Sequence, residues 1–93
     1  MDFWMAGSGR YAGHRSGNDF FDATGRHVGI FNGAHVHSNK TGRQVAVVVA
    51  ERYLASATGG GTTIGVYDRG STGGCDKGNI GASGQGSDPT WPR

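Results

Sequence analysis

The stretch DFFDATGRHVGIFNG, residues 19–33, contains two short apolar runs separated by a turn and followed by Asn-Gly. Asp22 and Gly25 stand at the first and fourth positions of DATG, a pattern typical of a type I turn closed by a left-handed glycine. Asn32-Gly33 is the strongest short-range signal for a two-residue type I′ turn. The stretch therefore predicts a β-hairpin followed at once by a second tight turn.

The same frame recurs in FWMAGSGRYAGHRSGN (3–18), VHSNKTGRQVAVVVAE (36–51) and YLASATGGGTTIGVYDR (53–69). Each repeat has an apolar start, a turn ending in glycine, and a small residue four positions further on. The turn-closing glycines are Gly9, Gly25, Gly42 and Gly61, and the later small residues are Gly13, Gly29, Ala46 and Gly65. Self-similarity at a fixed period is a property of repeat architectures. We predict an all-β fold of four tandem hairpins over residues 1–68.

Alternation along the second strand of each predicted hairpin gives two faces. The face richer in aliphatic residues is the predicted core: Ala12, His14, Val28, Ile30, Val45, Val47, Ile64 and Val66. The opposite face carries Tyr11, Gly13, Arg15, His27, Gly29, Phe31, Gln44, Ala46, Val48, Thr63, Gly65 and Tyr67. A mid-strand glycine marks a close approach, so an aromatic side chain of a first strand, Trp4, Phe20 or Tyr53, is expected to cover it. Residues 45–57 mix helix and strand formers, and the register of the repeats assigns them to strands.

On these residues the chain resembles the four-fold beta-flower family of small bacterial proteins, in which about four hairpins with a D-x-x-G-(R/K)-x-x-G-x-F frame surround a pseudo-four-fold axis. The resemblance rests on FFDATGRHVGIFNG and covers roughly residues 2–68. Ala46 replaces the second glycine in the third repeat, and Thr62 replaces the arginine in the fourth. The resemblance implies a fold and no catalytic residue.

Residues 69–93 form a Gly-rich C-terminal extension of different composition. Gly78, Gly81 and Gly84 recur every third residue, the period of polyproline II. This composition is typical of a flexible tail, whereas Ile80 and Trp91 are apolar anchors that a linker does not need. The alternative hypothesis is that the tail packs along the hairpins of its own or a neighbouring subunit, with Trp91 docked.

Apolar side chains are scarce. Leu, Ile, Val and Phe together number 15 of 93 residues, against 19 glycines, and Cys75 is the single cysteine, so no disulfide can form within the chain. Small domains with so little core usually rely on a metal or on assembly. We therefore expect a homo-oligomer or a protein partner, and a non-enzymatic structural or protein-interaction role. The formal net charge of +2 is spread along the chain, which makes nucleic acid an unlikely partner.

Three arginines follow the turn glycines, Arg10, Arg26 and Arg43, and around an axis they would form a partial ring able to hold an anion. The more ordinary interpretation is that each braces its turn. Aromatic residues near basic ones suit stacking on a nucleic-acid base or a sugar: Trp4, Tyr11 with Arg15, Phe31 and Tyr67. Their alternative role is to supply the core.

Three histidines, His27, His35 and His37, form a weak candidate metal set, because the last two are two residues apart and the first is predicted on the adjacent strand. Solvent-facing histidines are the simpler interpretation, and we predict no cofactor. The serines and Cys75 lack a nucleophile motif, and no phosphate-binding glycine loop is present, so we predict no enzyme. The start of the chain lacks a secretory signal and no stretch reaches membrane-spanning length, which makes a cytoplasmic location the default expectation.

Overall fold

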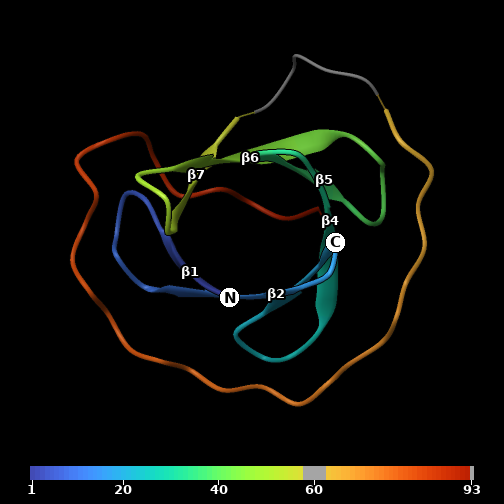
Figure 1. Ribbon diagram of the computed structural model, residues 1–93, viewed down its shortest axis with the longest axis horizontal. Coiled ribbons are helices and arrows are strands. Elements are labelled where there is room, and N and C mark those ends of the chain that lie inside the picture. The colour runs from blue at the N-terminus through green and yellow to red at the C-terminus, as the bar shows by residue number, and fades with distance from the viewer. Residues whose placement is uncertain (58–62, 93) are drawn as a thin grey trace.

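A computed structural model describes residues 1–57 and 63–92, and these contain seven strands and no helix (Figure 1). The strands are β1 Asp2–Met5, β2 Tyr11–Ser16, β3 Asp19–Asp22, β4 His27–Asn32, β5 His35–Ser38, β6 Gln44–Val49 and β7 Tyr53–Ser56. Each is paired with the next in antiparallel fashion, and β7 pairs in parallel with β1 to close a barrel. The all-β prediction is confirmed, and so is the assignment of residues 45–57 to strands.

Three hairpins with the same register form most of the barrel: hairpin 1 is β1–β2, hairpin 2 is β3–β4 and hairpin 3 is β5–β6. In each, the register shifts in the middle of the first strand, because the second strand carries one extra residue at that point. The residue just before the shift is large and pairs with a small residue of the second strand. These pairs are Phe3 with Gly13, Phe20 with Gly29, and Val36 with Ala46. The sequence repeat thus corresponds to one structural unit in these three hairpins.

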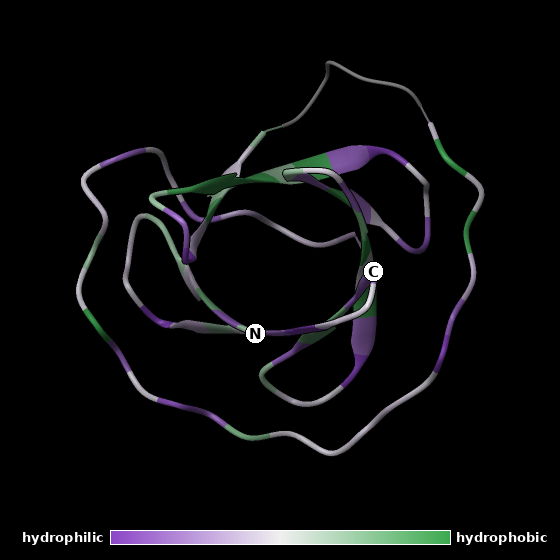
Figure 2. Ribbon diagram, in the orientation of Figure 1, coloured by the Kyte–Doolittle hydropathy of each residue, from purple (hydrophilic) through white to green (hydrophobic). Residues whose placement is uncertain are grey.

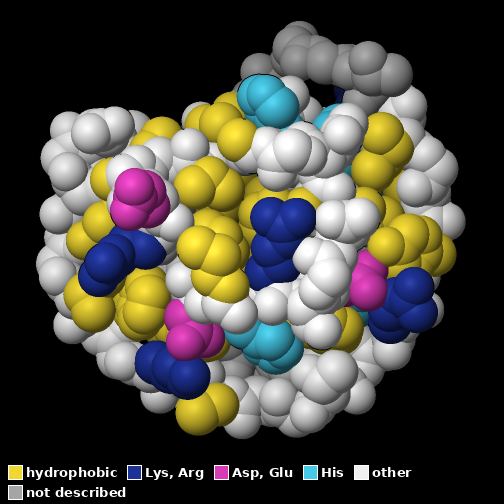
Figure 3. All heavy atoms as spheres, viewed as in Figure 1, with side chains coloured by type: hydrophobic (Ala, Val, Ile, Leu, Met, Phe, Trp, Pro, Cys, Tyr) yellow, Lys and Arg dark blue, Asp and Glu magenta, His cyan; other side chains and the backbone are white. Residues whose placement is uncertain are grey.

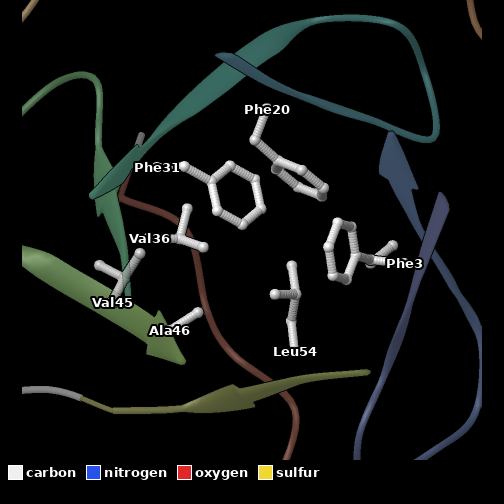
Figure 4. Packing of buried hydrophobic residues seen from close by; sticks show 8 residues of the cluster. Phe3, Phe20, Phe31, Val36, Val45, Ala46 and Leu54 are labelled. Atoms are coloured by element: carbon white, nitrogen blue, oxygen red, sulfur yellow. The ribbon is translucent and has the colours of Figure 1, made fainter. Parts of the chain in front are cut away.

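The core is built around the large residue of each first strand. Phe3, Phe20, Val36 and Leu54 of β7 are each at most 1% exposed, and Figure 4 shows their side chains converging on one centre. Phe31 fills the remaining space, with its ring centroid 5.4 Å from that of Phe3. Figure 2 shows that hydrophobic residues are concentrated in the strands and are sparse along the C-terminal tail.

The predicted division of strand faces was wrong for Phe31 and Ala46, which belong to the core together with Ala12 and Val45. The physical reason is the narrow interior of a small barrel, where small and large side chains must alternate. A Cβ on Gly29 would lie 2.8 Å from Val36 Cγ1, and one on Gly13 would lie 2.9 Å from the Phe20 ring. The small residue of one hairpin therefore makes room for the large residue of the next.

The predicted fourth hairpin has only its first strand. Residues 58–62, which include Gly61, lie outside the described residues, and residues 63–68 form no strand. The prediction of a core role for Ile64 and Val66 was therefore wrong, and Val66 is 46% exposed. The reason is that β1 pairs with the edge of β7 through Trp4–Tyr53 and Met5–Leu54.

The C-terminal tail, residues 63–92, runs around the outside of the strand ring and then crosses toward β4 (Figure 1). Its backbone bonds the three hairpin turns in reverse chain order. The amides of Ile64, Thr72 and Ile80 donate to the carbonyls of Gly42, Gly25 and Gly9, at 2.9, 2.8 and 3.0 Å. Trp91 then stacks on Phe20, with ring centroids 5.4 Å apart. The side chain of Ile80 remains 43% exposed, so this residue is held by its backbone.

Candidate ligand-binding pocket

A pocket of about 500 Å³ lies where the turns of hairpins 2 and 3 meet the end of the tail. Hairpin 2 contributes residues 22, 24 and 26–28, hairpin 3 contributes residues 39 and 40, and the tail contributes residues 89–92. These segments are far apart in sequence. The pocket therefore exists only because the tail returns to the barrel after passing around it.

Two buried polar residues, His27 and Asn39, line the pocket. The backbone amide of Arg69 donates to His27 Nδ1 at 2.9 Å, which places the ring proton on Nε2, where it bonds the Gly29 carbonyl at 2.9 Å. Asn39 Nδ2 donates to the His27 carbonyl at 3.0 Å. These bonds fix both side chains and tie the second strand of hairpin 2 to hairpin 3 and the tail.

Two cations, Arg26 and Lys40, lie at the rim with exposed side chains. Within residues 1–57 and 63–92, neither forms an ion pair. The nearby Asp22 carboxylate is used in the turn, where it accepts from the backbone amides of Thr24 at 2.9 Å and Arg26 at 3.1 Å. The rim therefore presents two positive groups beside a carboxylate that is already hydrogen-bonded.

Trp91 adds an unusual donor. Its indole packs on Phe20, and its Nε1–H is buried without an acceptor in the part of the chain that the structure describes. A buried donor without a partner costs about 1–3 kcal/mol. The residues lining the pocket thus include two exposed cations, Arg26 and Lys40, and a tryptophan whose buried indole N–H has no acceptor among the described residues.

The three arginines that the sequence singled out occupy separate hairpins. Arg10, Arg26 and Arg43 all follow a turn glycine with positive φ and all are exposed. Figure 1 shows the hairpin turns projecting outward at different points around the ring. Arg26 lines the pocket, and Arg10 and Arg43 do not.

The aromatic residues considered for ligand stacking are used inside the fold. Phe31 is 3% exposed and Tyr11 is 7% exposed. The Tyr11 hydroxyl donates to Asp2 at 2.7 Å, and Trp4 Nε1 donates to the Gly78 carbonyl at 3.0 Å. The Arg15 guanidinium lies 4.3 Å from the centre of the Phe31 ring. These rings supply packing within the described structure.

The candidate histidines do not gather. His27 and His37 are buried, and His35 is exposed. His37 Nδ1 bonds the Gly42 carbonyl at 2.9 Å. Among the described residues, no three His, Cys, Asp or Glu side chains are placed so that they could hold a metal ion.

The visible surface offers no broad apolar area. In Figure 3, hydrophobic side chains are interspersed with polar ones, and several basic side chains lie beside acidic ones. The exposed large hydrophobic residues of the described chain are Met1, Val66, Tyr67 and Ile80. The pocket is therefore a more specific candidate than an apolar contact surface.

No protein-family model, curated protein or solved structure matches the chain. Within the described residues, no helix has the length and apolar character needed to cross a membrane.

Sequence reasoning found Arg26 and missed Lys40, Asn39 and Thr90 as neighbours of the same pocket. No local pattern marks them, because three distant segments supply the lining. The repeated arginines suggested that the hairpins have equivalent surroundings. The pocket forms at hairpins 2 and 3 because the end of the tail lies there.

Proposed function

We propose that this protein is a non-enzymatic interaction module whose pocket accepts an acidic group of a protein partner, a carboxylate side chain or a chain terminus. The observation that carries the proposal is the pair of exposed cations at the rim, Arg26 and Lys40, which form no ion pair among the described residues. A carboxylate is acceptor-only and offers about four lone-pair sites, which suits such a set.

The size of the pocket supports a short segment as the ligand. Pockets of roughly 300–1,000 Å³ hold drug-sized ligands, and this one of about 500 Å³ fits a few residues of peptide. Val28, Pro89 and Pro92 add apolar lining beside the polar groups. The two cations are exposed, so each adds at most about 1 kcal/mol to binding.

The hydrogen bonding of the pocket supports a binding role over a catalytic one. Both ring nitrogens of His27 are engaged, and the Asp22 carboxylate is held by its own turn. A general base needs a free lone pair within reach of a substrate proton. His27 offers none, and in Asp22 the turn bonds all go to Oδ1, which lowers the basicity of that carboxylate.

We also propose that the chain is a variant of the four-fold hairpin arrangement in which the second strand of the fourth hairpin has been replaced by the encircling tail. Support comes from the large buried residue that recurs at 3, 20, 36 and 54, which gives β7 the same core role as the three first strands. The cytoplasmic location remains a prediction from the sequence.

A titration followed by NMR tests the pocket. The probe is tri-aspartate acetylated at its N-terminus and amidated at its C-terminus, and the matched probe without charge is tri-asparagine capped in the same way. We expect shifts of the backbone amides of residues 24–26, 39–40 and 90–91 and of the Trp91 indole N–H. The double substitution Arg26→Ala and Lys40→Ala is expected to weaken binding roughly tenfold, which corresponds to about 1.4 kcal/mol.

The control is Arg10→Ala with Arg43→Ala, which removes the same number of charges outside the pocket. This variant should bind the acidic probe as the parent does. Equal weakening by both double substitutions, or equal shifts with tri-asparagine, would show non-specific attraction and contradict the proposal.

A further inference from the structure

The tail contains an eight-residue repeat that matches the hairpins. Residues 63–70, 71–78 and 79–86 read TIGVYDRG, STGGCDKG and NIGASGQG, and we call them octads 1, 2 and 3. The shared pattern is Thr, Ser or Asn, then Ile or Thr, then Gly, with Gly again at position 8. Position 7 is Arg, Lys or Gln. The period of three seen at Gly78, Gly81 and Gly84 is only a local part of this pattern.

The same position of each octad, position 2, is hydrogen-bonded to a hairpin turn. The amide at position 2, from Ile64, Thr72 or Ile80, donates to the carbonyl of a turn glycine. The contact is so close that it excludes side chains. A Cβ on Gly25 would collide with the backbone of Gly73, and a Cβ on Gly9 would collide with that of Gly81, both at position 3 of their octads.

Positions 6 and 8 shape the tail between hairpins. Asp68 Oδ1 accepts from the Gly70 amide at 2.7 Å, and Asp76 Oδ1 accepts from the Gly78 amide at 2.8 Å. Both glycines have positive φ, 78° and 83°, a conformation that favours glycine. Their carbonyls accept bonds from the barrel, from the His27 amide at 2.8 Å and from Trp4 Nε1 at 3.0 Å.

Position 7 recognises charge. Arg69 Nε lies 2.6 Å from Asp19, and Lys77 Nζ lies 2.9 Å from Asp2. Each acid is the first residue of the first strand of its hairpin, β3 or β1. Each acid accepts a second hydrogen bond. The hydroxyl of Tyr11, in the barrel, donates to Asp2, and the hydroxyl of Tyr67, in octad 1, donates to Asp19. Octads 1 and 2 therefore each bind the turn glycine of one hairpin and the acid of the hairpin that precedes it in the chain.

We propose that the rim formed by the three hairpin turns is a peptide-binding track for this octad pattern, and that the tail of a second molecule can replace the chain's own tail on it. The track recognises backbone through the turn glycines and charge through Asp2 and Asp19. This inference does not depend on the acid-binding pocket. Under this proposal, molecules associate by exchanging tails and not through an apolar contact surface.

Concentration decides which tail is bound. A tethered segment has an effective concentration of the order of millimolar, so dilute protein binds its own tail and is monomeric. Tail exchange requires release of the resident tail, and it is therefore favoured by refolding at high protein concentration.

The test uses the whole sequence as two chains. Residues 1–60, with an affinity tag, and residues 61–93 are co-expressed, and a fluorescently labelled peptide of residues 61–93 is added to the purified protein. We expect the tail chain to copurify and the labelled tail to exchange into the complex. An unlabelled peptide with both position 7 charges reversed, Arg69→Glu with Lys77→Glu, should compete with the labelled tail at least about tenfold more weakly. The reason is that each Glu then faces an aspartate.

The matched control peptide carries Val66→Ala and Cys75→Ser at exposed positions 4 and 5. It should compete as the unchanged tail does. Loss of the tail from a soluble 1–60 chain, failure to obtain a soluble complex, or equal competition by the charge-reversed peptide would overturn the track. The double substitution Arg26→Ala and Lys40→Ala should weaken binding of the acidic probe and leave exchange of the tail unchanged. The two experiments therefore test the pocket and the track separately.

The second molecule is tested with uncut protein. Two differently tagged copies are unfolded, mixed and refolded at high and low concentration. Mixed dimers at high concentration, reduced by Arg69→Glu with Lys77→Glu and absent on dilute refolding, support exchange. Monomers alone at every concentration would overturn the exchange of tails between molecules.

Discussion

The barrel of residues 2–56 and the tail of residues 63–92 are both held by regular hydrogen bonding, but they obtain it differently. In the barrel, strands pair with strands around a ring of large buried side chains. In the tail, almost every side chain is exposed. The second amide of each octad donates to a hairpin turn, and the carboxylates of Asp68 and Asp76 cap the segments between.

The difference lies in what glycine does in each region. In the barrel, Gly13 and Gly29 leave space for Phe20 and Val36 of the next hairpin. At the rim, Gly25 allows the backbone of Gly73 to approach the turn. Glycine content alone therefore does not separate an ordered segment from a flexible one. The decisive property is whether each glycine faces a partner at a regular spacing.

The largest expected effect is on the barrel. In Gly13→Ala, the new Cβ would collide with the Phe21 carbonyl, and the backbone has φ of 147°, which L side chains rarely adopt. We expect a loss of about 3 kcal/mol or more in the free energy of unfolding, measured by urea denaturation followed by circular dichroism.

The control for this prediction is Gly17→Ala. Gly17 has φ of 62° and nothing within 4 Å of the added Cβ, so it reports the backbone conformation alone, about 1 kcal/mol. Equal losses in the two variants would show that the packing of hairpin 1 on hairpin 2 is not what Gly13 protects.

The next largest expected effect is on the contact between the tail and hairpin 2. In Gly25→Ala, the Cβ would collide with Gly73, and φ is 86°. We expect a loss of about 2 kcal/mol, of which about 1 kcal/mol is backbone strain. Hydrogen exchange should become faster at the Thr72 amide, which donates to Gly25, while the Gly13–Asp22 ladder between β2 and β3 keeps its protection.

Gly33→Ala is the matched control, because Gly33 has φ of 64° and no atom within 4 Å of the added Cβ. It should leave exchange at Thr72 unchanged. If instead both variants release the tail, or if Gly25→Ala unfolds barrel and tail together, the two regions are one cooperative unit and the comparison fails.

The sequence predicted the hairpins because their signals are local. Asp22 and Gly25 determine one turn within a few residues, and a tight turn at Gly33 was also predicted, but the type I′ turn with Asn32 at its centre was wrong. Asn32 ends β4 and pairs with His35, so the two-residue turn is Gly33-Ala34, and only Gly33 has positive φ. The repeat of 16–17 residues allows the weaker hairpins to be recognised from the strongest one.

The faces of the strands were harder. The usual preference for aliphatic cores placed Phe31 and Ala46 outside, whereas a narrow closed barrel requires small residues to face inward.

The fourth repeat and the pocket depend on contacts between distant residues. Closure of the barrel by β1 against β7 cannot be read from residues 53–69, because the competing partner lies about 50 residues earlier in the chain. The octads were present in the sequence from Thr63 onward, but a repeat of backbone contacts leaves little apolar periodicity. The signal that could have found them is the recurrence of Asp-Arg-Gly and Asp-Lys-Gly at a spacing of eight.

The smallest expected effect is the dependence of tail binding on pH. Hydrogen bonds from Lys77 and from the Tyr11 hydroxyl hold the pKa of Asp2 below its ordinary value of 3.8. For Asp88, burial opposes ionisation, but bonds from Ser8 and the Gly7 amide lower its pKa overall. A carboxyl with a lowered pKa in the folded protein stabilises it fully above the ordinary value. That stabilisation is lost as the pH falls through 3.8 and then through the lower folded pKa.

We therefore expect acidification to weaken the tail before the barrel. Hydrogen exchange compared between about pH 5 and about pH 3 should show lost protection at Ile80, whose amide bonds hairpin 1 between the Asp2 and Asp88 contacts, beyond the intrinsic effect of pH on exchange. Asp2→Asn should remove part of this pH dependence and leave protection at Ile64, on hairpin 3, as it was. If Ile80 and Ile64 lose protection in parallel in both proteins, the carboxylates do not fasten the tail one hairpin at a time, and its hold on the barrel comes from the turn glycines alone.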